Sequence, residues 1–214
     1  MAGSSSGWEV LQNLTGLESL SIYSSDLRQL GEIIRSLTSL QYLCISGCPV
    51  LAMLPEWLGG FRSLQTLVLK EIPLLASLRK SIMLLTSLEK LAIVECDNLK
   101  ELPEVVNHLT SLKELDISSC RNLSQLPEGI QHLTNLEDLS IQDCLALHKL
   151  PEGLGMLGSL EDLMINILPV LTTLPESMQG LTSLRHINLM SCPMLTVLPE
   201  SLGQLSALRS LYMQ

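Results

Sequence analysis

Three acidic residues recur at intervals of 24 residues in the middle of the chain, and their spacing suggests a binding surface. Glu114, Asp138 and Asp162 each open a short stretch in which polar and apolar residues alternate. Such alternation is typical of a half-buried strand. If the three stretches are neighbouring strands, their carboxylates stand about 5 Å apart on one face, where like charges repel and cost stability.

An acidic column of this kind has two interpretations. It can attract a basic surface of a partner protein, which speeds encounter and sets orientation, or it can be a solvated face that keeps the molecule in solution. The sequence leaves both open. Seven further residues are expected on or beside the same face and complete the predicted protein-binding set: Tyr42, Lys70, Lys90, Glu95, Asp116, Asp143 and His186.

The sequence carries no motif for metal binding or catalysis. Clustered carboxylates can bind Ca²⁺, but neither an EF-hand loop nor a calcium-binding nonapeptide is present. The P-loop, G-x-G-x-x-G, H-E-x-x-H, G-x-S-x-G and paired C-x-x-C motifs are also missing. His108 and His132 share one repeat position and are expected to be surface histidines. We therefore predict no metal, no cofactor and no enzymatic activity, since an enzyme would need catalytic residues converging on the strand face.

A repeat of about 24 residues must position these side chains. A leucine opens each unit, at Leu17, Leu40, Leu64, Leu88, Leu112, Leu136, Leu160, Leu184 and Leu208. The first step is 23 residues and every later step is 24. A period in the twenties with the pattern L-x-x-L-x-L-x-x-C/N-x-L is the signature of a leucine-rich-repeat solenoid. We predict one array of about eight to nine repeats over residues 8–214, preceded by a flexible lead over residues 1–7.

Each part of the unit has a structural role. In the repeat that contains LKELDISSC, Leu115 points into the core, Asp116 points out, and Cys120 turns inward at the corner that ends the strand. Pro127 suits the start of a short helical segment because its missing N–H would be unpaired there, and Glu128 favours a helix start electrostatically. The predicted fold class is therefore an α/β solenoid or horseshoe, with a parallel sheet on the concave face and short helical, 3-10 or loop segments on the convex face.

The cysteine pattern predicts buried thiols rather than disulfides. Five cysteines occupy the same repeat position: Cys48, Cys96, Cys120, Cys144 and Cys192. A free cysteine behaves as a small buried apolar residue, and unpaired thiols fit a reducing compartment. Cys44 differs, because it falls on an outward strand position and is expected to be an exposed thiol.

The composition argues against several classes of partner. The chain has 214 residues and a net charge of −9, so we expect no contact with nucleic acid, which needs a basic face, and none with an anionic membrane. The N-terminus lacks the pattern of a secretory signal, and no apolar run reaches the roughly 18 residues of a membrane span. A cytoplasmic location is predicted.

The ends and a few units depart from the regular pattern. The array opens on the back half of a repeat and stops in a strand, so we expect a fragment of a longer protein. Gly31 replaces the proline of the Leu-Pro-Glu motif, and Arg79-Lys80 replaces Pro-Glu, which creates a basic spot. Trp57 is expected on the convex side.

The unit L-x-x-L-x-I-x-x-C-x-x-L-x-x-L-P-E-x-I-x-x-L-T-S resembles the C-terminal repeats of plant intracellular nucleotide-binding leucine-rich-repeat disease-resistance proteins. The stretch WEVLQNLTGLESLSIYSSDL is similar to a unit of their coiled-coil class. The resemblance covers Trp8 to Gln214 and implies a module that senses a pathogen effector or a modified host protein. It also implies that the repeats hold an attached nucleotide-binding domain inactive. No binding residue carries over, because ligand residues vary among these receptors.

A second family also has the L-P-x-x-I-x-x-L pattern. Stand-alone intracellular scaffolds of the Ras-group type carry such repeats, and the resemblance to them implies binding to a GTPase or a phosphatase. The alternative function is therefore a scaffold without an attached ATPase.

Overall fold

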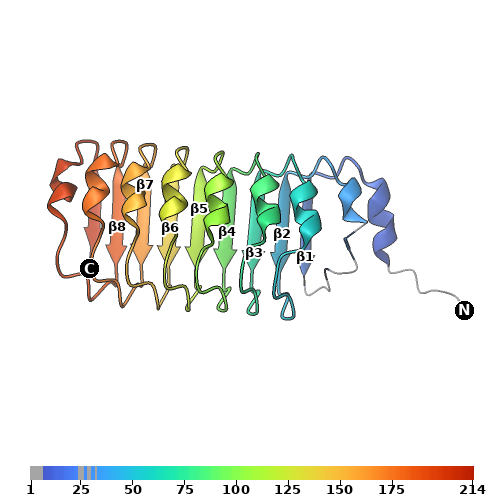
Figure 1. The fold of residues 1–214 in the computed structure, drawn as a ribbon, viewed down its shortest axis with the longest axis horizontal. Helices are drawn as coiled ribbons and strands as arrows, with labels where there is room; N and C mark the ends of the chain where they lie inside the picture. The colour runs from blue at the N-terminus through green and yellow to red at the C-terminus, as the bar shows by residue number, and fades with distance from the viewer. Residues whose placement is uncertain (1–6, 24–26, 28–29, 32) are drawn as a thin grey trace, which may run out of the picture.

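The computed structural model describes residues 7–23, 27, 30–31 and 33–214, which form a single stack of repeats (Figure 1). We call each strand, with the turn and the 3-10 segment that follow it, a rung. The described residues contain a nine-stranded parallel sheet whose strands lie in sequence order. This confirms the predicted leucine-rich-repeat solenoid. Residues 1–6 of the predicted lead lie outside the described residues, and Gly7 already begins a 3-10 segment.

The strands are short and nearly equal in length. They are β1 (Ser19–Tyr23), β2 (Tyr42–Ser46), β3 (Thr66–Lys70), β4 (Lys90–Val94), β5 (Glu114–Ser118), β6 (Asp138–Gln142), β7 (Asp162–Asn166), β8 (His186–Met190) and β9 (Ser210–Met213). The 3-10 segments are η1 (Gly7–Asn13), η3 (Ile34–Ser36), η4 (Glu56–Gly60), η5 (Lys80–Leu84), η6 (Glu104–His108), η7 (Glu128–His132), η8 (Glu152–Met156), η9 (Glu176–Gly180) and η10 (Glu200–Gln204). They form a layer on the opposite side of the stack from the sheet (Figure 1).

The register between strands follows the repeat period. In the pairing of β4 with β5, Leu91 faces Leu115 and Ile93 faces Ile117. The inward residues of all rungs join into one core of leucine and isoleucine side chains, most of them fully buried. The face of the sheet that points away from this core is called the outer face below. Each residue on it lies beside the equivalent residue of the next repeat.

The corner after each strand is built around a buried thiol or an aliphatic replacement. Cys48, Cys96, Cys120, Cys144 and Cys192 are all buried there as free thiols. Ile72 and Leu168 fill the same place in the rungs of β3 and β7. The Sγ of Cys120 donates to the carbonyl oxygen of Ser118 at 3.7 Å. The prediction of buried corner thiols is confirmed.

Cys44 lies on the outer face as expected, but the prediction that it is exposed is wrong. Its side chain is only 7% exposed. Burial is the largest effect on the pKa of the Cys44 thiol and raises it, while a hydrogen bond with Tyr42 and the charge of Lys70 act in the opposite direction. Because the thiolate is the reactive form of cysteine, we expect Cys44 to react slowly.

The residue after each of β2 to β8 adopts a left-handed backbone conformation. These residues are Gly47, Glu71, Glu95, Ser119, Asp143, Ile167 and Ser191, with φ from 51° to 61°. Each of those after β2 to β7 donates its N–H to the last carbonyl of the neighbouring strand, as Glu95 does to Ser118 at 2.9 Å, and Ser191 donates to Gln214, just after β9. Glycine adopts this conformation readily, so Gly47 was the only clue to it in the sequence.

Among the residues in these left-handed turns, Ile167 is under the greatest backbone strain, because β-branched residues strongly disfavour a positive φ. Its φ is 55° and its side chain is 47% exposed. We expect Ile167→Asn to raise the free energy of unfolding by about 1 kcal/mol, measured by urea titration. Ser191→Asn, which keeps an unbranched polar residue, should change less. A loss of stability in Ile167→Asn would mean that its contacts outweigh the strain.

Two of the glutamates that begin 3-10 segments, Glu128 and Glu152, cap the segment of the next rung. The carboxylate of Glu128 accepts the N–H of Gly153 at 2.9 Å. That of Glu152 accepts the N–H groups of Glu176 at 3.3 Å and Ser177 at 3.0 Å. Glu128 lies in the first turn of η7, as its predicted electrostatic role requires. The carboxylates of Glu128 and Glu152 also satisfy free N–H groups across the rung boundary and so tie consecutive rungs together.

Glycines allow close approach between 3-10 segments in the second half of the stack. A Cβ added to Gly155 would overlap the carbonyl oxygen of Ser177, and one added to Gly180 would overlap the carbonyl oxygen of Gly155. Gly203 holds the same place in η10 that Gly155 holds in η8, but has open space around it. Glycine is thus required at only some of these equivalent positions.

Alanine substitution should separate these two cases. Gly155→Ala forces η8 away from η9 and should lower the free energy of unfolding by about 2 kcal/mol, measured by urea titration. Gly203→Ala is the matched control and should be neutral or slightly stabilising, because alanine reduces the freedom of the unfolded chain. Equal effects at the two positions would contradict the packing described here.

Trp57 and the predicted basic spot both make contacts with neighbouring side chains. Trp57 is only 7% exposed, and its ring meets that of Phe61 edge-on with centroids 5.9 Å apart. A Cβ added to Gly31 would lie 3.0 Å from the indole, so the missing proline makes room for Trp57. Trp57 belongs to η4, in the layer opposite the sheet, so its predicted place on the convex side is confirmed, and its side chain is buried there. At the basic spot, Arg79 lies 2.7 Å from the carboxylate of Glu56 in the preceding rung.

Candidate protein-binding surface

The predicted acidic column is present on consecutive strands. The register places Glu114 beside Asp138 and Asp138 beside Asp162. Each is the first residue of its strand and lies on the outer face. Lys90, the first residue of β4, makes an ion pair with Glu114. The column therefore ends in two carboxylates without such a partner, Asp138 and Asp162, called the acid pair below.

The residues immediately before β4 to β9 form a second charged column. Lys113 Nζ lies 3.0 Å from a carboxylate oxygen of Glu89, and Arg185 Nη1 lies 2.5 Å from one of Glu161. Glu137 occupies the equivalent position before β6. In the described part of the chain, no ion pair joins Glu137 or the acid pair to a basic side chain. Opposite charges in adjacent rungs thus compensate one another on both sides of the acid pair.

Crowding of carboxylates affects the ionisation of Asp138. Burial is the largest effect and raises the pKa of Asp138 above its ordinary value, and neighbouring carboxylates raise it further. In decreasing order of effect these neighbours are Asp162, Glu114, Glu137 and Glu161. The ionised form of Asp138 is therefore less favourable in the folded protein than in water, and a bound cation would offset this electrostatic penalty.

The outer face is hollowed over β6 to β9. The hollow has a volume of about 540 Å³ and is lined by the acid pair together with His186, Met164 and Tyr212. His186 Nδ1 lies 2.6 Å from Ser210 Oγ, which holds the imidazole toward β9. Arg209 lines the far end. Acidic, apolar and basic groups therefore share one depression.

Asn188 lines this hollow and carries an acceptor without a partner. Its Oδ1 is buried and makes no hydrogen bond within the described residues. In the register, Asn188 lies between Met164 of β7 and Tyr212 of β9. A buried acceptor left unsatisfied costs about 1–3 kcal/mol, so a donor supplied by a ligand would be favourable here.

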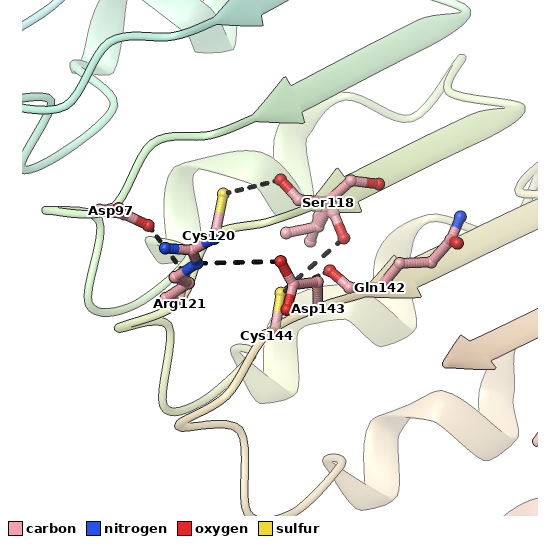
Figure 2. A network of polar contacts seen from close by, with 8 residues as sticks. Asp97, Ser118, Cys120, Arg121, Gln142, Asp143 and Cys144 are labelled. Carbon is pink, nitrogen blue, oxygen red and sulfur yellow. Dashed lines mark hydrogen bonds and ion pairs between the residues drawn. The ribbon is translucent and has the colours of Figure 1, made fainter. Parts of the chain in front are cut away.

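Three of the predicted binding residues lie at strand ends and corners. Lys70 ends β3 and its Nζ lies 3.2 Å from the carboxylate of the adjacent Glu71. Glu95 and Asp143 occupy the left-handed turns after β4 and β6. Figure 2 shows the corner at Asp143, whose Oδ2 lies 3.8 Å from Arg121 Nε. Glu95 lines a separate hollow of about 610 Å³ at the corners, so these residues do not join the acid pair.

The remaining predicted residues are spread along the outer face. Asp116 lies at the third position of β5 and accepts a hydrogen bond from Ser118 Oγ at 2.5 Å. Tyr42 begins β2, in the first half of the sheet, and burial raises the pKa of its phenol. The structure therefore gathers the acid pair and His186 in the hollow, places Lys90 next to them in its own ion pair, and leaves Tyr42 apart.

Four residues of this surface were not in the predicted set. Glu137, Glu161 and Arg209 each precede a strand, and an alignment of that single repeat position would have shown a second charged column. Asn188 holds the third position of β8, which the repeat places on the outer face. Its significance depends on side-chain packing, for which the sequence holds no signal.

Metal clusters and membrane helices are not found in the residues that the structure describes. No group of three or more His, Cys, Asp or Glu side chains among them is placed to hold a metal ion. None of the described helical segments has the length and apolar character needed to cross a bilayer.

Comparison with known proteins identifies the class of fold. A family model described as Leucine Rich Repeat matches residues 39–61, 111–133 and 183–205. No significant match is found among curated protein sequences. Together with the parallel sheet and the 3-10 segments, the matched repeats define a leucine-rich-repeat domain, a class that generally serves as a protein–protein interaction module.

Solved structures share this architecture. The leucine-rich repeat domain of the type III effector XopL has 25% identity and a TM-score of 0.77, with coverage of 94% of this chain and 69% of that one. A leucine-rich-repeat protein of Leptospira interrogans has 27% identity and a TM-score of 0.71, with coverage of 95% and 56%. The plant peptide hormone receptor RGFR1, solved with RGF2, has 21% identity and a TM-score of 0.53, with coverage of 92% and 34%. The chain thus spans little more than half of the Leptospira protein and about a third of the receptor.

The raised pKa of Asp138 predicts that Asp138→Asn stabilises the protein at neutral pH. The charged form is disfavoured in the folded state, so the penalty is present above the raised pKa and absent below the ordinary range of an aspartate. We expect a gain of roughly 0.5 kcal/mol in urea unfolding at about pH 7, and no gain at about pH 3. Asp116→Asn is the control and should show no gain. A loss of stability in Asp138→Asn at neutral pH would contradict the expected repulsion.

Proposed function

We propose that the chain is a non-catalytic protein-recognition module that binds a partner with a basic surface through the outer face of its sheet. The observation that carries this proposal is the acid pair, which lies in a hollow and has no ion-pair partner among the residues that the structure describes, while Glu114 and Glu161 beside it are paired with Lys90 and Arg185. Complementary charge would raise the association rate and select the orientation of the partner. The compensated neighbours would contribute less, because exposed ion pairs change little on binding.

We place this module in a plant immune receptor of the intracellular nucleotide-binding class, acting in the cytoplasm in the defence response. The combination of L-T-S-L, L-P-E and a corner cysteine in one repeat unit supports this assignment. The partner would be a pathogen effector, a guarded host protein, or the nucleotide-binding domain of the same receptor, which the repeats would hold inactive. The complex of the plant receptor RGFR1 with RGF2 supports a protein ligand for a domain of this fold.

Charge reversal on the outer face tests this function. The double variant Asp138→Lys, Asp162→Lys should capture the partner at least tenfold less than the unmodified protein in quantitative affinity purification from plant extract. The matched control is Glu176→Lys, Glu200→Lys, which makes the same charge change at exposed positions of η9 and η10 on the opposite side of the stack. Proteins lost with the first variant and retained by the second are the partners of this face.

The identity and salt dependence of those proteins complete the test. Titration calorimetry with the purified partner should show affinity that falls with added salt. An effector, a host target or a nucleotide-binding domain supports the immune receptor, whereas a GTPase or a phosphatase supports the scaffold. Equal capture by the two double variants would contradict recognition through the acid pair.

A further inference from the structure

We propose that the hollow over β6 to β9 is a binding site for one extended peptide segment of the partner, in which a lysine or arginine stands beside a large apolar residue. This inference rests on the proposed function and specifies its ligand. It differs from a general attraction between surfaces, because it requires a cationic group, an apolar group and a backbone donor at defined places.

The acid pair defines the place of the cationic side chain. Asp138 and Asp162 face each other across neighbouring strands, about 5 Å apart at the backbone. A guanidinium or ammonium group between them would contact both carboxylates and relieve their repulsion. Lys90 is held by Glu114 on one side of the pair, and Arg185 is held by Glu161 on the other. These two basic groups on either side of the pair are thus engaged, and the place is left for a cation from outside.

The hollow favours a basic residue of the ligand only at the end that holds the acid pair. Arg209 lines the opposite end and makes no ion pair within the described residues. A second basic residue of the ligand near β9 would be repelled, whereas an acidic side chain or a free carboxyl group would be attracted. The charges therefore also set the direction in which the segment lies.

An apolar strip lies beside the acid pair along the third strand position. Met164 is 36% exposed and Tyr212 is 60% exposed, and the register aligns them on either side of Asn188. A methionine adapts its flexible side chain to varied apolar groups, and an exposed tyrosine is among the residues that contribute most to binding. The equivalent position in β2, β3 and β4 holds Cys44, Val68 and Ala92, of which Val68 is partly exposed and the other two are buried. The large apolar side chains exposed at this position are therefore found at this end of the described sheet.

Asn188 provides the polar contact for the backbone of the segment. Its Oδ1 is buried and has no partner within the described residues, while other atoms of the residue line the hollow. If the Asn188 side chain turns its amide oxygen toward the hollow, a peptide N–H that crosses the strip would satisfy this acceptor, as buried polar groups require. The hollow crosses four strands, about 14 Å at the strand spacing, which matches about four residues of extended chain.

Selection of short random peptides displayed on phage tests the site with a defined probe. The immobilised domain should enrich peptides that contain lysine or arginine next to a large apolar residue. Synthetic copies of these peptides should bind at least tenfold more weakly to Asp138→Asn, Asp162→Asn and to Tyr212→Ala. Glu95→Gln, which neutralises an acid at the corner outside the hollow, should bind as the unmodified protein does. The single variant Asp138→Asn should also bind these peptides more weakly. Because this variant is expected to be more stable than the unmodified protein, its weaker binding cannot result from unfolding.

A double-mutant cycle makes the assignment specific. Replacing the basic residue of the peptide by glutamine should weaken binding to the unmodified protein but have little further effect on Asp138→Asn, Asp162→Asn. No enrichment of peptides, or enrichment without the basic and apolar pair, would overturn the inference. Peptides that are unaffected by these variants but lost on Tyr42→Ala would also overturn it, while recognition through the outer face would still stand. If the two charge-reversal variants described above captured the partner equally, the proposed function itself would be contradicted.

Discussion

The equal length of the repeats is the constraint on which the structure depends. Strands that repeat at a fixed interval in a parallel sheet place every residue about 5 Å from its equivalent in the next rung. Leucine and isoleucine stack favourably under this rule, and the core extends through all rungs without interruption. The same alignment destabilises charged residues of one sign, because identical charges in one column repel. The sign of each charged residue therefore matters in relation to its neighbours one repeat away.

The charged columns show how the chain responds to this constraint. Opposite charges in adjacent rungs form ion pairs around β4 and β5 and again between Glu161 and Arg185. Such exposed pairs contribute little to stability individually. Their larger effect is to leave the acid pair as an isolated negative site. The hollow, the apolar strip and the unpartnered amide of Asn188 occur at the same end of the sheet, so the features suited to binding are concentrated there.

Periodicity was sufficient to predict the solenoid, the inward leucines, the corner cysteines and the alignment of Glu114, Asp138 and Asp162, because each depends only on position within the repeat. Features that depend on side chains reaching into another rung could not be predicted in the same way. The ion pair of Lys90, the capping of η8 by Glu128 and the burial of Cys44 are of this kind. The left-handed turns were hidden for a different reason, since tertiary packing imposes them on residues that do not favour them.

Titration of the Asp138 carboxyl group by NMR, in the unmodified protein and in Asp162→Asn, is the most direct test of the central claim that register leaves an uncompensated acid pair. The account predicts that the pKa of Asp138 lies above the ordinary value of an aspartate and falls part of the way back when Asp162 loses its charge. An ordinary or lowered pKa in the unmodified protein would contradict it. So would a raised pKa that does not respond to Asp162→Asn, because the two carboxylates would then not interact across the rungs.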